Sequence, residues 1–297
     1  MREHDFMARR FEEHRGHLRA VAYRMLGSLT EADDAVQETW LRLARAEAGD
    51  IDNLGGWLTT VVGRVCLDVL RSRRLRREDP LEVGLPDPVV TDDGADPEHQ
   101  ALLADSVGLA LLVVLESLNP AERLAFVLHD LFGMPFEQIA PIMDRTPVAT
   151  RKLASRARLR VRGAAPAPDP DPAVQRRVVD AFLTAARGGD LTALLDVLDP
   201  DVTLRADGGK ALPGGVRVLR GIDAVAGQLA TFHRMATAST TRPALVNGAA
   251  GLVNTLDGEL LSIIGFTVVD GRIAEVDILS DPDRLARLVA DGHLRQV

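Results

Sequence analysis

Apolar residues between positions 119 and 162 recur every three or four places in separate groups, which is typical of consecutive helices. The first group consists of Leu124, Val127, Leu128 and Leu131, and Gly133 ends it. The second, shorter group consists of Phe136, Ile139, Ala140 and Met143. A tight turn is predicted at 144–146. Thr146 is a good N-cap and Pro147 a good first helical residue, so a third helix should begin there.

The third predicted helix is strongly basic. Three of its apolar residues are expected to pack inward: Leu153, Ala157 and Val161. Its basic residues are Arg151, Lys152, Arg156, Arg158, Arg160 and Arg162. A short helix, a turn and a basic helix on an apolar scaffold are typical of a helix-turn-helix, which enters the major groove of DNA. Taken alone, this segment also fits a helical bundle with a solvated basic face.

Residues 18–77 form a second predicted helical unit. A helix over 31–43 has an acidic and polar face beside an aromatic residue, formed by Asp33, Asp34, Gln37, Glu38 and Trp40. After a loop, a helix led by Trp57 runs into a cluster of arginines that ends near position 77. The two units together, in this order, resemble region 2 and region 4 of the extracytoplasmic-function sigma factors. The resemblance covers most of residues 6–162.

The resemblance implies that the protein binds core RNA polymerase and directs promoter-specific initiation. Region 2 would recognise and melt the −10 element as a single strand, and region 4 would read the −35 element as a duplex. The acidic face of region 2 is expected to contact polymerase. A different interpretation is a helix-turn-helix regulator fused to a ligand-binding or isomerase-like domain.

The resemblance and the chemistry of DNA recognition also give candidate DNA-binding residues. In region 2, Asn53 is the candidate reader of a flipped base, and the candidate phosphate contacts are Arg64, Arg71, Arg73 and Arg74. In region 4, spacing along the basic helix is expected to expose one face that carries Thr150, Arg151, Ser155 and Arg158. Arg151 is placed early enough in the helix to reach guanine, with which arginine pairs bidentately.

Charge is distributed unevenly along the 297 residues. The chain has 35 basic and 43 acidic residues, a net charge of −8, yet arginines crowd the ends of both predicted DNA-binding units. Such a protein should bind DNA weakly by itself, because its acidic parts repel phosphate.

The single cysteine of the chain, Cys66, is expected to be a core residue. The chain shows no signal peptide and no spanning apolar run, so we expect a cytoplasmic protein without membrane contact.

Two linkers divide the chain into domains at 1–77, 106–163 and 173–297. The linker over 78–105 is rich in proline and acid, so it is expected to be extended and mobile when free, without packing of its own. The linker over 164–172 alternates proline with small or acidic residues and should be a stiff spacer.

Residues 173–297 predict helices followed by antiparallel strands, an α+β layout. Helices are expected over 174–187, from Asp190 onward and over 221–235. Strands are expected over 202–207, 244–247, 249–256, 259–269 and 272–279, with tight turns at Asp257-Gly258 and Asp270-Gly271. This order resembles the SnoaL-like, nuclear-transport-factor-2-like cone fold. The fold class is therefore multidomain: two all-α sigma domains and an α+β cone domain.

A subgroup of these sigma factors, including the mycobacterial sigma-J type, carries such an extension together with short shared motifs. Two charged segments resemble the motifs of the extension: Asp207-Gly208-Gly209-Lys210 and Asp281-Pro282-Asp283-Arg284. Residues 85–88 match the tail of the linker motif, but Gly84 replaces its tryptophan. The resemblance implies regulation in cis. Both segments are expected to be charged turns that face the arginine-rich helices and keep the sigma regions compact.

The extension could also be catalytic, because cone-fold enzymes use an Asp base, and Asp207 or Asp277 could serve. No His or Tyr partner is evident beside Asp207, and His233 is isolated. We therefore expect no catalytic residue, no cofactor and no metal ion. The cavity of the extension could still hold a small ligand.

Overall fold

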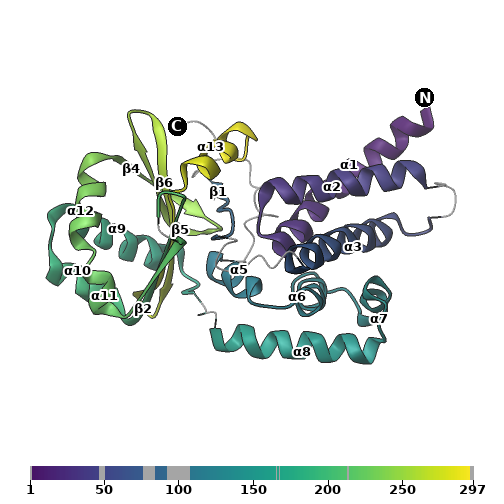
Figure 1. Ribbon diagram of the computed structural model, residues 1–297, viewed down its shortest axis with the longest axis horizontal. Coiled ribbons are helices and arrows are strands. Elements are labelled where there is room, and N and C mark those ends of the chain that lie inside the picture. The colour runs from purple at the N-terminus through teal and green to yellow at the C-terminus, as the bar shows by residue number, and fades with distance from the viewer. Residues whose placement is uncertain are drawn as a thin grey trace. The chain divides into compact units, whose positions relative to one another are not determined.

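The computed structural model describes residues 2–46, 51–75, 84–91, 108–164, 166, 168–212 and 214–294, with the side chains of 2–5 left out (Figure 1). It divides into two compact units, each described by itself below. The first unit comprises Met1–Glu78 and Val114–Ala164, and the second comprises Asp79–Val113 and Ala165–Val297. The two sigma regions thus share one unit, except that the start of region 4 up to Val113 belongs with the first linker to the unit of the C-terminal domain.

Region 2 is a bundle of three helices, α1 (Arg2–Leu26), α2 (Leu29–Arg45) and α3 (Leu54–Leu75). Gly27 has the positive φ that ends α1, and Ser28 caps α2 by accepting a hydrogen bond from the Glu31 amide. The apolar stripe of α2 faces the bundle, with Leu29, Ala32, Ala35, Val36 and Leu43 buried. Cys66 is fully buried in α3, and burial raises the pKa of its thiol to about 12.

Region 4 consists of α5 (Leu109–Glu116), α6 (Pro120–Phe126), the π-helix η2 (Val127–Leu131), α7 (Phe136–Ile139), the 3₁₀ helix η3 (Ala140–Met143) and α8 (Pro147–Ala164). The predicted cap is confirmed, since the Thr146 hydroxyl accepts from the Ala149 amide at 3.3 Å. Asp144 adopts the left-handed conformation in the turn before α8, at φ 55°. These are the helices and the turn of a helix-turn-helix.

The two sigma regions pack directly on each other within the first unit. Gly63 of α3 lies where an added Cβ would touch Leu124, Leu128 and Ile142 at 3.5–3.6 Å, so the absence of a side chain allows close approach. The imidazole of His17 meets the ring of Phe132 edge-on at 5.2 Å. Contacts between side chains of the regions themselves therefore make this unit compact.

The C-terminal domain is a curved sheet covered by helices. The helices are α9 (Pro172–Gly188), α10 (Leu191–Val197), α11 (Ile222–Ala226), α12 (Leu229–Ala238) and α13 (Pro282–Ala290). The strands are β1 (Val90–Thr91), β2 (Leu198–Gly209), β3 (Gly215–Arg220), β4 (Thr240–Val246), β5 (Ala249–Leu256), β6 (Glu259–Val269) and β7 (Arg272–Leu279). Within the described residues the strand order is β1-β4-β5-β6-β7-β2-β3, antiparallel except for β2 beside β7.

Helices α9 to α12 lie on one side of this sheet, and α13 lies on the other (Figure 1). The core fills the space between the sheet and α9 to α12, where Phe182 meets Phe232 and Phe266 at 5.4 and 5.2 Å. Asp257 and Asp270 take positive φ in the two predicted hairpin turns. The predicted bounds of β5, β6 and β7 are confirmed.

Several expectations for this domain are wrong. The helix predicted over 221–235 is two helices, α11 and α12, separated at Gly227 and Gln228. Strand β3 was not expected. Residues 281–284 form the start of α13 rather than a turn, with Asp281 as its N-cap.

Among the described helices, none combines the length and apolar character needed to cross a bilayer.

The first linker has packing of its own, contrary to the prediction. Residues 84–91 are extended, as expected, but Leu85, Asp87, Val89 and Thr91 are buried, and β1 pairs with β4. The second linker is also anchored. The carboxylate of Asp169 accepts hydrogen bonds from the amides of Asp270 and Gly271 at 3.1 and 2.9 Å, so the C-terminal domain begins before residue 173.

Candidate functional site

The exposed face of α8 carries the side chains expected to meet DNA. Arg151, Lys152 and Ser155 are exposed there. Val148, which the pattern did not single out, is 62% exposed in the first turn, where an apolar side chain can contact a thymine methyl group. The face is thus basic with one apolar position near its beginning.

Two of the four predicted residues of α8 do not lie freely on that face. Thr150 is fully buried, and its hydroxyl donates to the carbonyl of Thr146 at 3.1 Å, so its predicted exposure is wrong. The physical reason is that its side chain points toward Met143 of the preceding 3₁₀ helix. Arg158 is half-buried in an ion pair with Asp130.

The arginines of region 2 divide in a similar way. Arg71 and Arg74 are exposed near the end of α3, and exposed Arg64 donates to the carbonyl of Pro141 at 3.1 Å. Arg73 is different, because it donates to the carbonyl of Leu26 at 3.3 Å and pairs with Glu31. It satisfies the C-terminal end of α1, and its contact with phosphate stays a prediction.

Asn53 is exposed immediately before α3. Its Oδ1 accepts a hydrogen bond from the Gly56 amide at 3.0 Å, as an N-cap does. The loop position fits the expected base reader, but a capping role already uses this oxygen. The N-cap signal was present in the sequence, since Asn precedes the helix directly.

The predicted polymerase-binding residues lie on α2. Asp34 and Gln37 are exposed. Asp33 pairs with Arg19 at 2.7 Å and Glu38 with Arg42 at 2.9 Å, and all four side chains stay partly accessible. Trp40 is half-buried, with its ring 5.2 Å from that of Phe11. The helix therefore presents a polar and acidic face with an aromatic edge.

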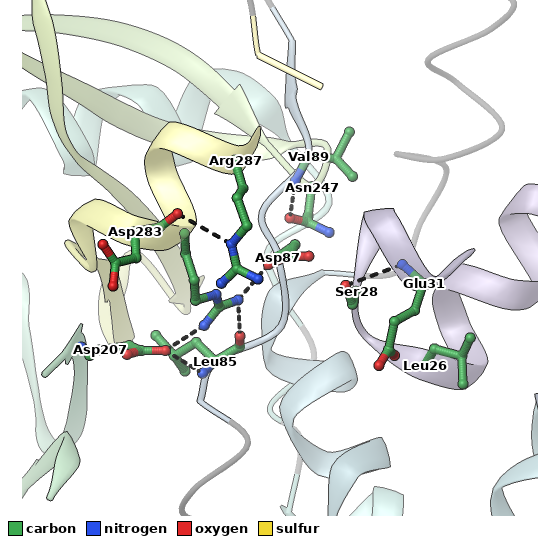
Figure 2. A network of polar contacts seen from close by, with 12 residues as sticks. Leu26, Ser28, Glu31, Leu85, Asp87, Val89, Asp207, Asn247, Asp283 and Arg287 are labelled. Atoms are coloured by element: carbon green, nitrogen blue, oxygen red, sulfur yellow. Dashed lines mark hydrogen bonds and ion pairs between the residues drawn. The ribbon is translucent and has the colours of Figure 1, made fainter. Parts of the chain in front are cut away.

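The most heavily connected polar site in the second unit joins the first linker to the C-terminal domain (Figure 2). Arg284 of α13 donates to the carboxylate of Asp207 at 2.5 Å and to the carbonyl of Leu85 at 2.6 Å, and it also pairs with Asp87. The same carboxylate of Asp207 accepts from the Leu85 amide at 2.9 Å. We call these four residues the Arg284 network.

Burial makes the Arg284 network structurally important. Asp207 is 3% exposed and Asp87 is 6% exposed. Buried carboxylates need such pairing, because an unpaired buried charge is strongly unfavourable. The carboxylate of Asp207 is therefore used within its own unit, and the contact of this segment with the arginine-rich sigma helices stays a prediction. Lys210 and Asp283 remain exposed and pair at 3.4 Å.

Gly84 explains the departure from the linker motif of the subgroup. It has φ +75°, and a Cβ there would come well inside 3.0 Å of Asp207 and Arg284. Gly209 also has a positive φ, +52°, and a Cβ there would come within 3.0 Å of the Asp281 side chain. A tryptophan at position 84 would therefore collide with the Arg284 network, so here the anchoring uses backbone groups and Asp87 instead.

A second contact fixes the following residues of the linker. The backbone N–H of Val89 donates to the side-chain Oδ1 of Asn247 at 3.1 Å (Figure 2). In return, the backbone N–H of Asn247 donates to the Val89 carbonyl at 2.8 Å. Asn247 is itself 2% exposed and has positive φ in the turn between β4 and β5. Residues 85–91 are thus attached along their length.

Asp277, the second aspartate considered as a catalytic base, is also ion-paired. Asp277 and Glu275 of β7 both pair with Arg205 of β2, at 3.0 and 2.7 Å. Burial and the neighbouring Glu275 raise the pKa of Asp277 to about 6 despite Arg205. The pocket between α9, α12 and the sheet is lined mainly by apolar side chains and has a cavity volume of about 20 Å³. That volume is close to that of one water molecule.

Replacing Asp277 with Asn is expected to flatten the pH dependence of stability. The folded-state pKa of about 6 lies above the ordinary 3.8, so the folded form binds the proton more tightly. The free energy of unfolding should therefore fall as pH rises through this window, by at most about 3 kcal/mol. Urea unfolding of the full chain between about pH 4 and 7 measures this. The exposed Asp180→Asn is the control, and equal slopes for wild type and Asp277→Asn would contradict the expectation.

Comparison with known proteins agrees with these features. The family models "Sigma-70 region 2" and "Sigma-70, region 4" match residues 10–76 and 108–161. Together with full-length relatives, they show that this chain belongs to the extracytoplasmic-function (ECF) sigma factors, which direct promoter-specific transcription initiation by RNA polymerase.

The relatives cover nearly the whole chain. It is 36% identical over 293 residues to the probable ECF RNA polymerase sigma factor SigI of Mycobacterium tuberculosis, covering 98% of this chain and 99% of that one. It is 40% identical over 286 residues to SigJ of the same organism, covering 92% and 91%. The crystal structure of SigJ matches with a TM-score of 0.75 at 35% identity, over 94% of this chain and 98% of that chain. The C-terminal α+β domain is therefore part of the shared architecture.

Proposed function

We propose that the C-terminal domain regulates initiation in cis by binding the linker between region 2 and region 4. The observation that carries this proposal is the Arg284 network, which attaches residues 85–87 to β2 and α13. A sigma factor must place its two regions far apart to contact the −10 and −35 elements together. An attached linker opposes that separation.

Chain length gives the size of the effect. From Leu75 to Leu109 a free linker could extend to about 110 Å. Attachment at residue 84 leaves only nine residue steps after Leu75, or about 30 Å. Binding of the linker therefore limits how far region 2 can move from the C-terminal domain, and release of the linker removes this limit. Polymerase would favour the released state by binding the separated regions.

Within this function, exposure supports separate roles for the described candidates. We assign −35 readout to Arg151 and Ser155, phosphate contacts to Arg64, Arg71 and Arg74, and polymerase contacts to Asp34, Gln37 and the edge of Trp40. Asn53 remains the candidate at the −10 element.

A pair of glycine variants tests the cis-regulatory proposal. Gly84→Ala introduces a Cβ that collides with the Arg284 network, whereas Gly258→Ala, at a similar positive φ, meets nothing within 4 Å. Both carry about the same backbone strain of 1–2 kcal/mol. Run-off transcription with core polymerase should rise at limiting concentrations of Gly84→Ala but not of Gly258→Ala. Equal activity of the two variants contradicts regulation through the linker, and initiation that does not need this chain contradicts the sigma function itself.

Replacing Arg151 with Ala should relax specificity at the −35 element. A bidentate arginine–guanine contact contributes about 1–3 kcal/mol of discrimination, and the side chain is exposed. Binding of the holoenzyme to promoter duplexes with single base-pair changes measures this. Arg156→Ala, another exposed position on α8, is the matched control. An equal loss of affinity for core polymerase would show a structural role instead.

A further inference from the structure

Arg151 does not extend freely into solvent, although it is exposed. Its guanidinium carbon lies 5.4 Å from the centre of the Phe136 ring. This distance and position over the ring are those of a cation–π contact. Phe136 is 7% exposed and begins α7, the first helix of the helix-turn-helix. The candidate base reader on α8 is therefore supported by an aromatic residue of the preceding helix.

Phe136 is in turn fixed by a histidine. The ring of His129 stacks on Phe136 with centroids 3.8 Å apart and an angle of 28° between the planes. Nδ1 of His129 lies 2.9 Å from the carbonyl of Met134, which can only accept, so Nδ1 carries the proton and donates. This hydrogen bond orients the imidazole. His129 belongs to the π-helix η2, a local widening that proteins often use at functional sites.

We propose that Phe136, held by His129, is a positioning residue that preorganises Arg151 for reading the −35 element. The inference rests on the proposed role of Arg151. An arginine side chain has many rotamers, and fixing it on binding opposes recognition. A guanidinium already supported by an aromatic face loses less freedom when it pairs with guanine. The support should act on discrimination between base pairs more than on overall affinity, since phosphate contacts provide the latter.

The test compares variants at position 136 in the full chain bound to core polymerase. The probe is a library of promoter duplexes randomised across the −35 element. Phe136→Leu keeps an apolar side chain but removes the ring, and it should reduce discrimination at the Arg151 position about fivefold. Phe136→Tyr keeps the ring and should retain discrimination. Ile139→Val, a buried change in the same helix, is the control for a general loss of packing.

A double-mutant cycle separates positioning from structure. In the Arg151→Ala background, Phe136→Leu should cause no further loss of discrimination. An undiminished effect in that background, or an equal loss of affinity for every duplex, overturns the proposal. The ring-current shift of the Arg151 side-chain protons in NMR spectra reports the stack independently of DNA. If the shift is present but Arg151→Ala leaves discrimination unchanged, the role of Arg151 as reader fails. If the shift is absent, the stack itself fails.

Discussion

Replacing Arg284 with Ala is expected to destabilise the C-terminal domain by about 3–5 kcal/mol and to detach residues 85–87 from it. The variant leaves two carboxylates, those of Asp207 and Asp87, buried without their shared cation. It also removes the donor to the Leu85 carbonyl. Chemical unfolding measures the loss of stability, and limited proteolysis of the native chain measures cleavage within residues 84–91.

Arg287→Ala is the matched control for this prediction. Arg287 lies one turn further along α13, is exposed, and donates to the carbonyl of Asp283 at 3.3 Å. It should change stability by less than about 0.5 kcal/mol. Adding Asp207→Asn to Arg284→Ala should recover part of the loss, because the buried charge disappears. If Arg284→Ala behaves like Arg287→Ala, the network does not hold the linker.

The resemblance to motifs of the subgroup pointed to the residues of this network but not to their relation to one another. Asp207, residues 281–284 and residues 85–88 were all recognised as short motifs. The first two looked like charged turns and residues 85–88 like part of a mobile linker, because nothing local indicates a partner 77 to 199 positions away. Proline and acid density in the linker also predicted mobility. Tertiary pairing with β4 overrides that tendency over residues 90–91.

Local signals predicted the helix-turn-helix well for a physical reason. Its cap, turn and apolar spacing are all set by neighbours within a few residues, as with Thr146 and Pro147. Errors arose where a long-range partner decided the orientation of a side chain. Arg73 looked like one more basic residue in a cluster, yet Glu31 and the end of α1 bind it. Thr150 looked exposed by spacing, yet Met143 of the preceding 3₁₀ helix covers it.

Replacing Arg123 with Ala is expected to loosen region 4 from region 2 and to lower the stability of the first unit by about 3–5 kcal/mol. Arg123 is 1% exposed in α6. Its Nη2 donates to Glu116 of region 4 at 2.9 Å, and its Nε donates to the Arg24 carbonyl in the last turn of α1 at 3.2 Å. It therefore bridges the two regions and binds a carbonyl in the last turn of α1.

Arg123→Ala should also change function in a way that an ordinary core substitution does not. Under the proposed function, region 2 and region 4 separate when polymerase binds, so a weaker bridge should speed the association of the full chain with core polymerase even as it lowers stability. Stopped-flow fluorescence measures the association rate, and urea unfolding measures stability. Arg160→Ala is the control, because Arg160 pairs with Glu122 at 2.7 Å entirely within region 4 and is half exposed. A loss of stability in Arg123→Ala without faster association would show that the bridge contributes to folding and does not restrain the separation of the regions.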